Sequence, residues 1–264
     1  MRRFGLRIVM PLMLAAWLLA GCAQMSAVSR DTPVVAEQAD LQQRTEIRMA
    51  LASAYYDAAQ YDSALQEVGR ALKTSPQRAD LHGLRALILM QMGQTPEAEQ
   101  SLRQALRLDA DNPDLQNNAG WFYCQTDRVA IAMPYFERAI ANRFYATPVK
   151  ALANAGICSL RAGDVAHAER YLLRAVEADP RHALAHASLA TIFYKRADYR
   201  QARQHIVLAV NGESMAADHL LMAIRIEQKL GDRNAEQSLA SQLRRLFPDS
   251  PQLLAYLRGE SDER

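Results

Sequence analysis

Three cysteines and two closely spaced histidines are the residues of this chain best suited to chemistry. Cys22, Cys124 and Cys158 are its only thiols, and a thiol can carry a lipid, close a disulfide or bind a metal. His182 and His186 are four residues apart, so on a helix both imidazoles would lie on one face. These five residues raise three questions: acylation, oxidation and metal binding.

The histidine pair does not suffice for a metal site. Zinc needs three or four converging ligands, and no cysteine is near; Glu177 and Asp179 lie beyond Pro180, which interrupts the helix. We therefore predict surface histidines, no metal and no other cofactor. A Gly-rich phosphate loop, Gly-x-Ser-x-Gly and His-Glu-x-x-His are all absent from the sequence. We expect no catalytic residues and no enzyme.

The first cysteine closes an amino-terminal leader. Three arginines within the first seven residues precede an apolar run over residues 8–20, the plan of a secretory signal peptide. The run ends in Leu-Ala-Gly-Cys at residues 19–22, which resembles the lipobox of bacterial lipoproteins. That resemblance implies a signal peptide over residues 1–21, with N-acyl and S-diacylglycerol lipid on Cys22. An ordinary signal peptide or a membrane helix is the alternative, although the run is shorter than the ~20 residues that span a bilayer.

A lipid on Cys22 would decide where the protein resides. Stable anchoring takes at least two acyl chains, and the lipobox pattern implies three. Ala23 stands where an Asp would resemble the inner-membrane retention signal, so the resemblance implies the periplasmic face of the outer membrane in a Gram-negative bacterium. Residues 22–44 show no apolar periodicity before Leu41. We expect them to form the lipidated terminus and a tether.

The charge of the mature chain argues against nucleic acid. The formal net charge of the full chain is +2, and losing the three leader arginines lowers it to −1. The remaining basic residues are interspersed with acids, as on a solvated outer face. We expect neither a nucleic-acid partner nor a small-molecule substrate.

The rest of the chain repeats with a fixed period of about 34 residues, the period of the tetratricopeptide repeat. Six alanines recur at close to this spacing: Ala64, Ala98, Ala132, Ala168, Ala202 and Ala235. Apolar residues follow each alanine four and seven positions later, except at Gln242, as two closely packed antiparallel helices require. The pattern as a whole resembles the tetratricopeptide repeat.

The period predicts an all-α fold. We expect a right-handed solenoid of six tetratricopeptide repeats over residues 45–258, a short capping helix over 252–257, and a tail over 259–264. The predicted repeats cover residues 45–78, 79–112, 113–148, 149–182, 183–215 and 216–248. The third repeat is two residues longer than its neighbours, and we expect the extra length in a surface loop over 142–147.

The two later cysteines fall in adjacent repeats. Cys124 and Cys158 are one repeat period apart in the sequence, which puts them in neighbouring layers of the stack. In an oxidising compartment such a pair can form a disulfide, which is the interpretation we favour. Two buried thiols that act as small apolar groups are the alternative.

A solenoid of this kind leaves a concave surface free for a partner. Its first helices carry apolar, methionine and aromatic residues that suit an amphipathic helix or an apolar peptide, and two asparagines, Asn118 and Asn154, occupy the same repeat position. Core packing is the alternative role for each residue. The candidate groove residues are Met49, Tyr56, Leu87, Met90, Asn117, Asn118, Trp121, Asn154 and Ile157, with Thr191 and Tyr194 further along.

Three segments resemble the pilotin lipoproteins of type IV pili, the PilF/PilW family. Residues 117–124 (Asn-Asn-Ala-Gly-Trp-Phe-Tyr-Cys) are similar to the Asn-Asn-Tyr-Gly-x-Phe-Leu-Cys element of that family, and residues 154–158 match its Asn-Ala-Gly-x-Cys element. Residues 246–251 (Leu-Phe-Pro-Asp-Ser-Pro) also fit. The main departure is Ala119, where the family usually has Tyr.

The resemblance implies a function in secretin assembly. Pilotins sit at the inner face of the outer membrane, bind the pilus secretin, and promote its localisation and multimerisation. The alternative is a periplasmic adaptor lipoprotein of the same build that serves cell-wall or outer-membrane assembly complexes. An enzyme with a helical-repeat accessory domain is disfavoured, because the repeats leave no residues for a catalytic domain.

Overall fold

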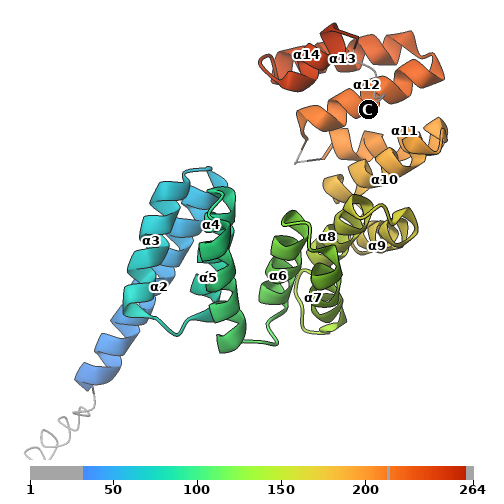
Figure 1. The fold of residues 1–264 in the computed structure, drawn as a ribbon. Coiled ribbons are helices and arrows are strands. Elements are labelled where there is room, and N and C mark those ends of the chain that lie inside the picture. The colour runs from blue at the N-terminus through green and yellow to red at the C-terminus, as the bar shows by residue number, and fades with distance from the viewer. Residues whose placement is uncertain (1–31, 213–214, 260–264) are drawn as a thin grey trace, which may run out of the picture.

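A computed structural model describes residues 32–212 and 215–259, and over these residues the chain forms thirteen helices and no strand (Figure 1). The helices are α2 (Thr32–Asp57), α3 (Tyr61–Thr74), α4 (Ala79–Gln91), α5 (Thr95–Leu108), α6 (Pro113–Gln125), α7 (Val129–Ala141), α8 (Pro148–Arg161), α9 (Val165–Ala178), α10 (Ala183–Lys195), α11 (Tyr199–Val210), α12 (Ala217–Leu230), α13 (Arg233–Leu246) and α14 (Pro251–Leu257).

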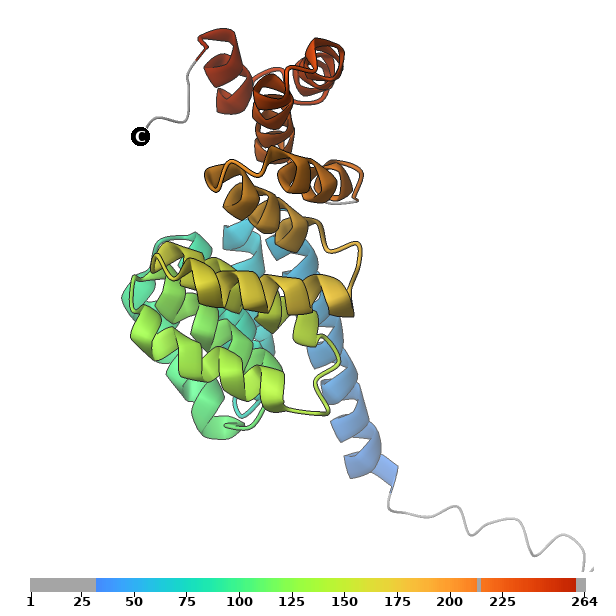
Figure 2. The same ribbon diagram turned by 90° about the vertical axis from the view of Figure 1, so that its right-hand side faces the viewer.

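The first twelve of these helices form six antiparallel pairs, from α2–α3 to α12–α13, and α14 packs on the last pair. Successive pairs rotate, so that α2–α5 run close to vertical in Figure 1 while α12 and α13 run across it (Figures 1 and 2). The prediction of an all-α, right-handed solenoid of six tetratricopeptide repeats with a carboxyl-terminal capping helix is confirmed. The loop over residues 142–147 between α7 and α8 is where the longer third repeat was expected to carry its extra residues.

One left-handed residue closes the turn inside every repeat. Glycine supplies it in three repeats, at Gly93, Gly163 and Gly231, because glycine adopts positive φ at little steric cost. The other three turns use residues with a side chain at the equivalent position, which are Ala59 (φ 56), Asp127 (φ 57) and Ala197 (φ 59). The repeat geometry therefore imposes this backbone conformation even where the sequence does not favour it.

Aspartates start three of the second helices. Asp164, Asp198 and Asp232 each accept a backbone amide three residues ahead through Oδ1, over 3.1 Å. Such a cap satisfies one of the amides that a helix start leaves without a partner. Asn112 does the same for α6, ahead of Pro113. These caps set where α6, α9, α11 and α13 begin.

The alanine ladder lies where the two helices of each repeat cross. The first five alanines of the ladder are fully buried, whereas Ala235, in the last repeat, is half-buried. Opposite the ladder, a Cβ on Gly120 would lie 2.6 Å from the Phe136 ring, and one on Gly156 would lie 2.6 Å from Leu172. The small residues therefore let the paired helices approach closely, as the spacing predicted.

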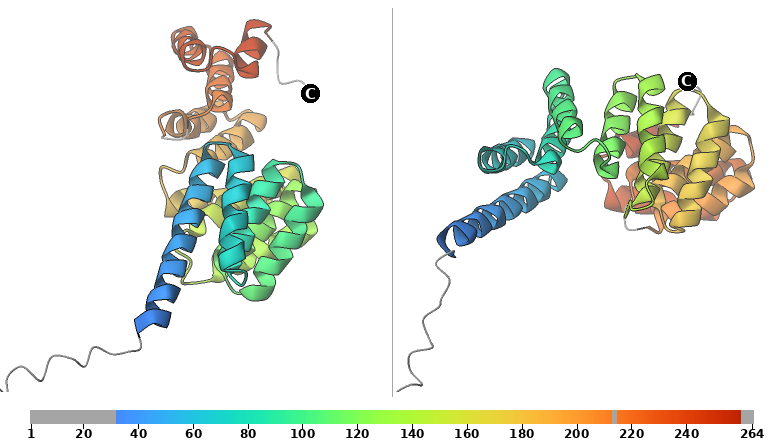
Figure 3. Two further views of the ribbon diagram at one scale, coloured as in Figure 1. Left: turned by 90° about the vertical axis from the view of Figure 1, so that its left-hand side faces the viewer. Right: turned by 90° about the horizontal axis from the view of Figure 1, so that it is seen from below.

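Part of the predicted tether is helical. Of residues 22–44, the structure places 32–44 in α2, which at 26 residues projects beyond the 14-residue α3 that it packs against (Figure 3). Residues 34–57 contain no glycine or proline and are rich in strong helix formers, so the helix of the first repeat continues toward the amino terminus. Cys22, the rest of the leader and residues 260–264 lie outside the described residues. Within the described part of the chain, no helix is both long and apolar enough to cross a membrane.

Candidate functional site: the concave face

The pattern of helix contacts identifies the concave face. The first helices (α2, α4, α6, α8, α10 and α12) lie backbone to backbone close to one another from repeat to repeat. Within the described residues the second helices do not approach one another as closely and meet through side chains, as where the Tyr171 hydroxyl of α9 donates to Glu137 Oε1 of α7 over 3.3 Å. Curvature brings the helices of the inner side together and separates those of the outer side. The first helices therefore line the concave side, which is where the predicted groove residues lie.

At the amino-terminal end of this face, two predicted groove residues also help to join repeats. Met49 and Tyr56 are half-buried and pack against the core of the first repeat. Arg78 Nη2 lies 3.6 Å from Met49 Sδ, and Gln91 Nε2 donates to the Tyr56 hydroxyl over 3.4 Å. Both residues thus link α2 to the second repeat while part of each side chain stays accessible.

Four larger apolar side chains form the middle of the face. Met90 and Trp121 are half-buried and pack against the core of the second and third repeats. Leu87 and Ile157 are also half-buried, but among the described residues they belong to no core cluster. Since packing does not account for them, Leu87 and Ile157 are the groove residues best placed to meet a partner.

The asparagines divide differently from the prediction. Asn117, predicted to face the groove, is buried at 6% exposure, and its Oδ1 accepts a hydrogen bond from Asn154 Nδ2 over 3.0 Å. Although Asn118 and Asn154 occupy the same repeat position, the Asn154 amide nitrogen is therefore engaged within the fold. Asn118 is half-buried beside Gly83 of α4, and no hydrogen bond of its side chain occurs in the described residues. Asn118 remains the available amide.

The third and fourth repeats are joined by more than packing. Cys124 and Cys158 form a disulfide between α6 and α8, with Cα atoms 5.8 Å apart, and both residues are buried. Arg161 Nη1 donates to the Cys124 carbonyl oxygen and to Gln125 Oε1, each over 3.1 Å. No motif in the sequence marks Arg161, so it was not among the predicted site residues. The available signal was its place at the end of the first helix of its repeat, from which a long side chain can reach the preceding repeat.

The histidines are structural, and the prediction that both lie at the surface is wrong for one. His186 is buried at 5% exposure; its Nε2 lies 3.0 Å from the Pro180 carbonyl oxygen and its Nδ1 lies 3.0 Å from His205 Nδ1. His182 caps α10 by accepting the Ala185 amide at Nδ1. Burial lowers the pKa of His182 and His205, and the positive charge of a protonated His186 adds to the effect at His205. In the described residues no three His, Cys, Asp or Glu side chains group as metal ligands would.

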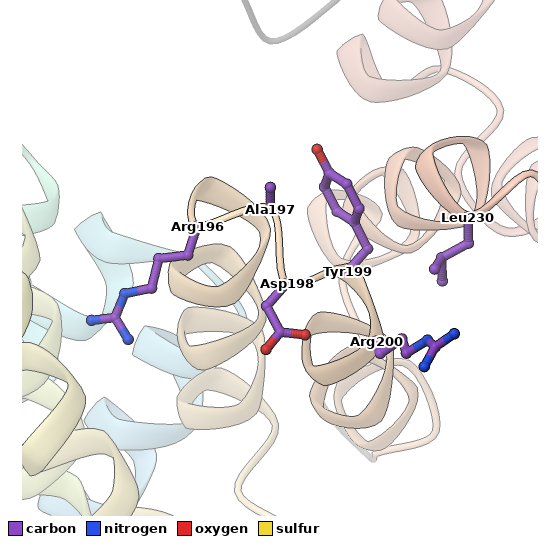
Figure 4. A pocket seen from close by; sticks show the side chains of 6 residues that line it. All are labelled: Arg196, Ala197, Asp198, Tyr199, Arg200 and Leu230. Atoms are coloured by element: carbon purple, nitrogen blue, oxygen red, sulfur yellow. The ribbon is translucent and has the colours of Figure 1, made fainter.

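A shallow hollow on the edge formed by the turns within repeats holds charged residues but no catalytic pair. Figure 4 shows Arg196 directed away from Arg200 and Leu230, and Arg196 Nη2 reaches Glu169 Oε2 at 2.6 Å. The Asp198 carboxylate is engaged in capping α11. The side chains that line the hollow are Arg196, Ala197, Asp198, Tyr199, Arg200 and Leu230. None of them is placed as a nucleophile with its base.

The family that the sequence matches defines the class of protein. The tetratricopeptide repeat family model matches residues 49–113, 84–148 and 159–216, which together exceed half of the chain. The stacked pairs and their concave face thus define a tetratricopeptide repeat protein, a class of scaffold for protein–protein interaction.

The similar proteins share more than the repeat. Type IV pilus assembly protein PilF of Pseudomonas aeruginosa is 27% identical over 196 residues, 74% of this chain and 78% of that protein. The crystal structure of PilW, described as a widely conserved type IV pilus biogenesis factor, matches with a TM-score of 0.69 and 32% identity over 81% of this chain and 98% of PilW. A structure of Pseudomonas aeruginosa PilF matches the fold with a TM-score of 0.69 and 24% identity, over 84% and 100% of the two chains. The chain belongs to the tetratricopeptide repeat family of type IV pilus biogenesis proteins that includes PilF and PilW.

Proposed function

We propose that this protein is a pilotin, an outer-membrane lipoprotein that binds the type IV pilus secretin and promotes its localisation and multimerisation. The observation that carries the proposal is the concave face, which exposes Leu87 and Ile157 outside the core and is held in shape by the Cys124–Cys158 bridge. Membership of a family of pilus assembly factors supports the choice of partner.

The proposed mechanism is physical. Acyl chains on Cys22 hold the protein at the periplasmic face of the outer membrane, and the groove binds a segment of the secretin. Joining the two affinities in one chain confines the secretin near its target bilayer and raises its local concentration for assembly. No catalytic step, metal or small-molecule substrate enters this mechanism.

Secretin assembly in cells that lack this protein tests the proposal. The strain is complemented with the wild type, with Cys22→Ala, and with the groove variant Ile157→Glu; Leu173→Glu is the matched control, because Leu173 is an exposed leucine on α9, a second helix. Secretin multimers are then measured in separated inner and outer membranes.

We expect outer-membrane multimers with the wild type and with Leu173→Glu, and their loss with the other two variants. Secretin that reaches the outer membrane and multimerises normally in the uncomplemented strain would contradict the proposal. Normal assembly with Ile157→Glu would contradict the part assigned to the groove.

A further inference from the structure

A second pocket lies outside the concave face, on the edge where one repeat passes to the next. It is a cavity of about 840 Å³ formed by the α9–α10 loop, the first residues of α10 and the end of α11, within the range of ligand pockets in proteins. Its position at the start of α10 separates it from Thr191 and Tyr194, the groove residues of the same helix. We propose that this pocket binds the carboxyl terminus of a peptide whose last side chain is apolar.

Two leucines form the apolar wall of the pocket. Leu184 of α10 and Leu208 of α11 both line the cavity, and they are 45% and 44% exposed. Aliphatic side chains that remain this accessible in a cavity gain from covering by another apolar group. The wall therefore fits an aliphatic side chain.

Three donors in the same pocket suit a carboxylate. Within the described residues, the side chains of Arg181 and Asn211 have no hydrogen bond or ion pair. His182 accepts the Ala185 amide at Nδ1 over 3.2 Å, so its neutral ring carries the proton on Nε2, which is a further donor. A guanidinium together with neutral donors is a favourable set for a carboxylate.

One acceptor distinguishes a peptide from a free fatty acid. Asp179 lines the cavity, and its Oδ1 accepts the Arg181 backbone amide over 3.0 Å. Its other oxygen has no hydrogen bond within the described residues and can accept a peptide N–H. A fatty acid carries the same carboxylate but has no N–H to offer, so it would leave this acceptor without a partner. Glu213 and Ser214, which follow the Gly212 edge of the pocket, lie outside the described residues.

Binding of short peptides to the purified mature protein tests the proposal. The probe is a fluorescently labelled Ala-Ala-Ala-Leu with a free carboxyl terminus, and affinity is measured by fluorescence anisotropy. Its comparators are the same peptide with an amidated terminus, and octanoate as a competitor. We expect saturable binding of the free acid, weaker binding of the amide by about tenfold or more, and poor competition by octanoate.

Matched variants locate the binding. Leu208→Ser and Arg181→Gln should each weaken binding of the free acid by about tenfold, while Leu173→Ser and Arg174→Gln, exposed positions on α9 outside the pocket, should leave it unchanged. Circular dichroism of all four variants establishes that they are folded. Equal binding of the amide, efficient competition by octanoate, absence of saturable binding, or equal loss in the α9 variants would each overturn the proposal.

Discussion

At the scale of single residues, side chains that look alike in the sequence have different tasks on the concave face. Asn117 and Asn154 hydrogen-bond each other across the α6–α8 contact, whereas Asn118 is left with its amide available. The hydrogen bond between these two amides stabilises the contact between α6 and α8, because leaving one buried amide without its partner costs about 1–3 kcal/mol. Repeat position alone does not separate a scaffold residue from a contact residue.

The left-handed alanines give a first prediction at this scale. Ala197→Gly should raise the free energy of unfolding by roughly 0.5–1 kcal/mol, because the strain of a side chain at φ 59 outweighs the entropy that glycine adds to the unfolded chain. Urea unfolding followed by circular dichroism measures the change. Ala190→Gly, in the interior of α10, is the control and should be destabilising; a loss of stability in both variants would refute the argument.

Three histidines that are half-buried or buried give a second prediction, on the dependence of stability on pH. Burial lowers the pKa of His182, His205 and His219 below the ordinary value of 6.5. In the window between the folded pKa and 6.5 the unfolded chain binds more protons, so the free energy of unfolding falls as pH drops below 6.5 and is unaffected by these groups above it. Urea unfolding between pH 7.5 and about 5 measures the slope.

A variant assigns that slope to the histidines. His205→Gln removes one of the three groups, so the dependence of stability on pH should become shallower. Stability that is constant over the window, or that rises as pH falls, would show that these three histidines do not control it.

At the scale of the helix pair, close approach is what the sequence pattern encodes. Gly120 and Gly156 stand where the next helix places Phe136 and Leu172, four residues beyond a ladder alanine in each case. A large side chain on one helix therefore faces a glycine on the other. The close packing leaves no free space for a methyl group added at that glycine.

A third prediction compares two glycines on helices. Gly120→Ala should destabilise the protein by about 1–3 kcal/mol, because its new methyl group would lie 2.6 Å from the Phe136 ring. Gly69→Ala in α3 should instead stabilise it by up to about 1 kcal/mol, since nothing lies within 4 Å of the new Cβ and alanine favours a helix. Urea unfolding measures the free energy of unfolding of both variants. A change of the same sign in both would be inconsistent with this packing.

The bridge between α6 and α8 gives a fourth prediction. Its two cysteines are 34 residues apart, so removing it should lower the free energy of unfolding by roughly 3–4 kcal/mol through the entropy of the unfolded chain. A reductant should lower the urea midpoint of the wild type and leave Cys124→Ser/Cys158→Ser unchanged. If the reductant leaves the wild-type midpoint unchanged in protein shown by a thiol assay to be reduced, the bridge contributes little.

At the scale of the whole molecule, the features that recur once in every repeat could be predicted, and the unique ones could not. The ladder alanines and their period predicted six pairs of helices, because stacking repeats the same contacts in each layer. The buried state of His186 depends on His205, on another helix, and the continuation of α2 to Thr32 depends on helix propensity in a segment without apolar periodicity. Neither of these two features produces a periodic pattern in the sequence.

The same limit applies to the groove. The sequence predicted which helices face the groove and eleven candidate residues on them. It could not separate Leu87 and Ile157 from Trp121 and Met90, which pack against the core. That separation depends on how far each layer is rotated against the next, a property of the assembled stack.

The affinity of the purified full-length lipoprotein for purified secretin tests the central claim most directly. Binding is compared for the wild type, for Leu87→Glu and Ile157→Glu on the concave face, and for Leu173→Glu on the outer face, so that the same charge enters at half-buried or exposed aliphatic positions in each case. The concave-face account predicts a loss of about tenfold or more for the first two variants and wild-type affinity for the third. Wild-type affinity in both concave variants, or an equal loss in Leu173→Glu, would contradict it.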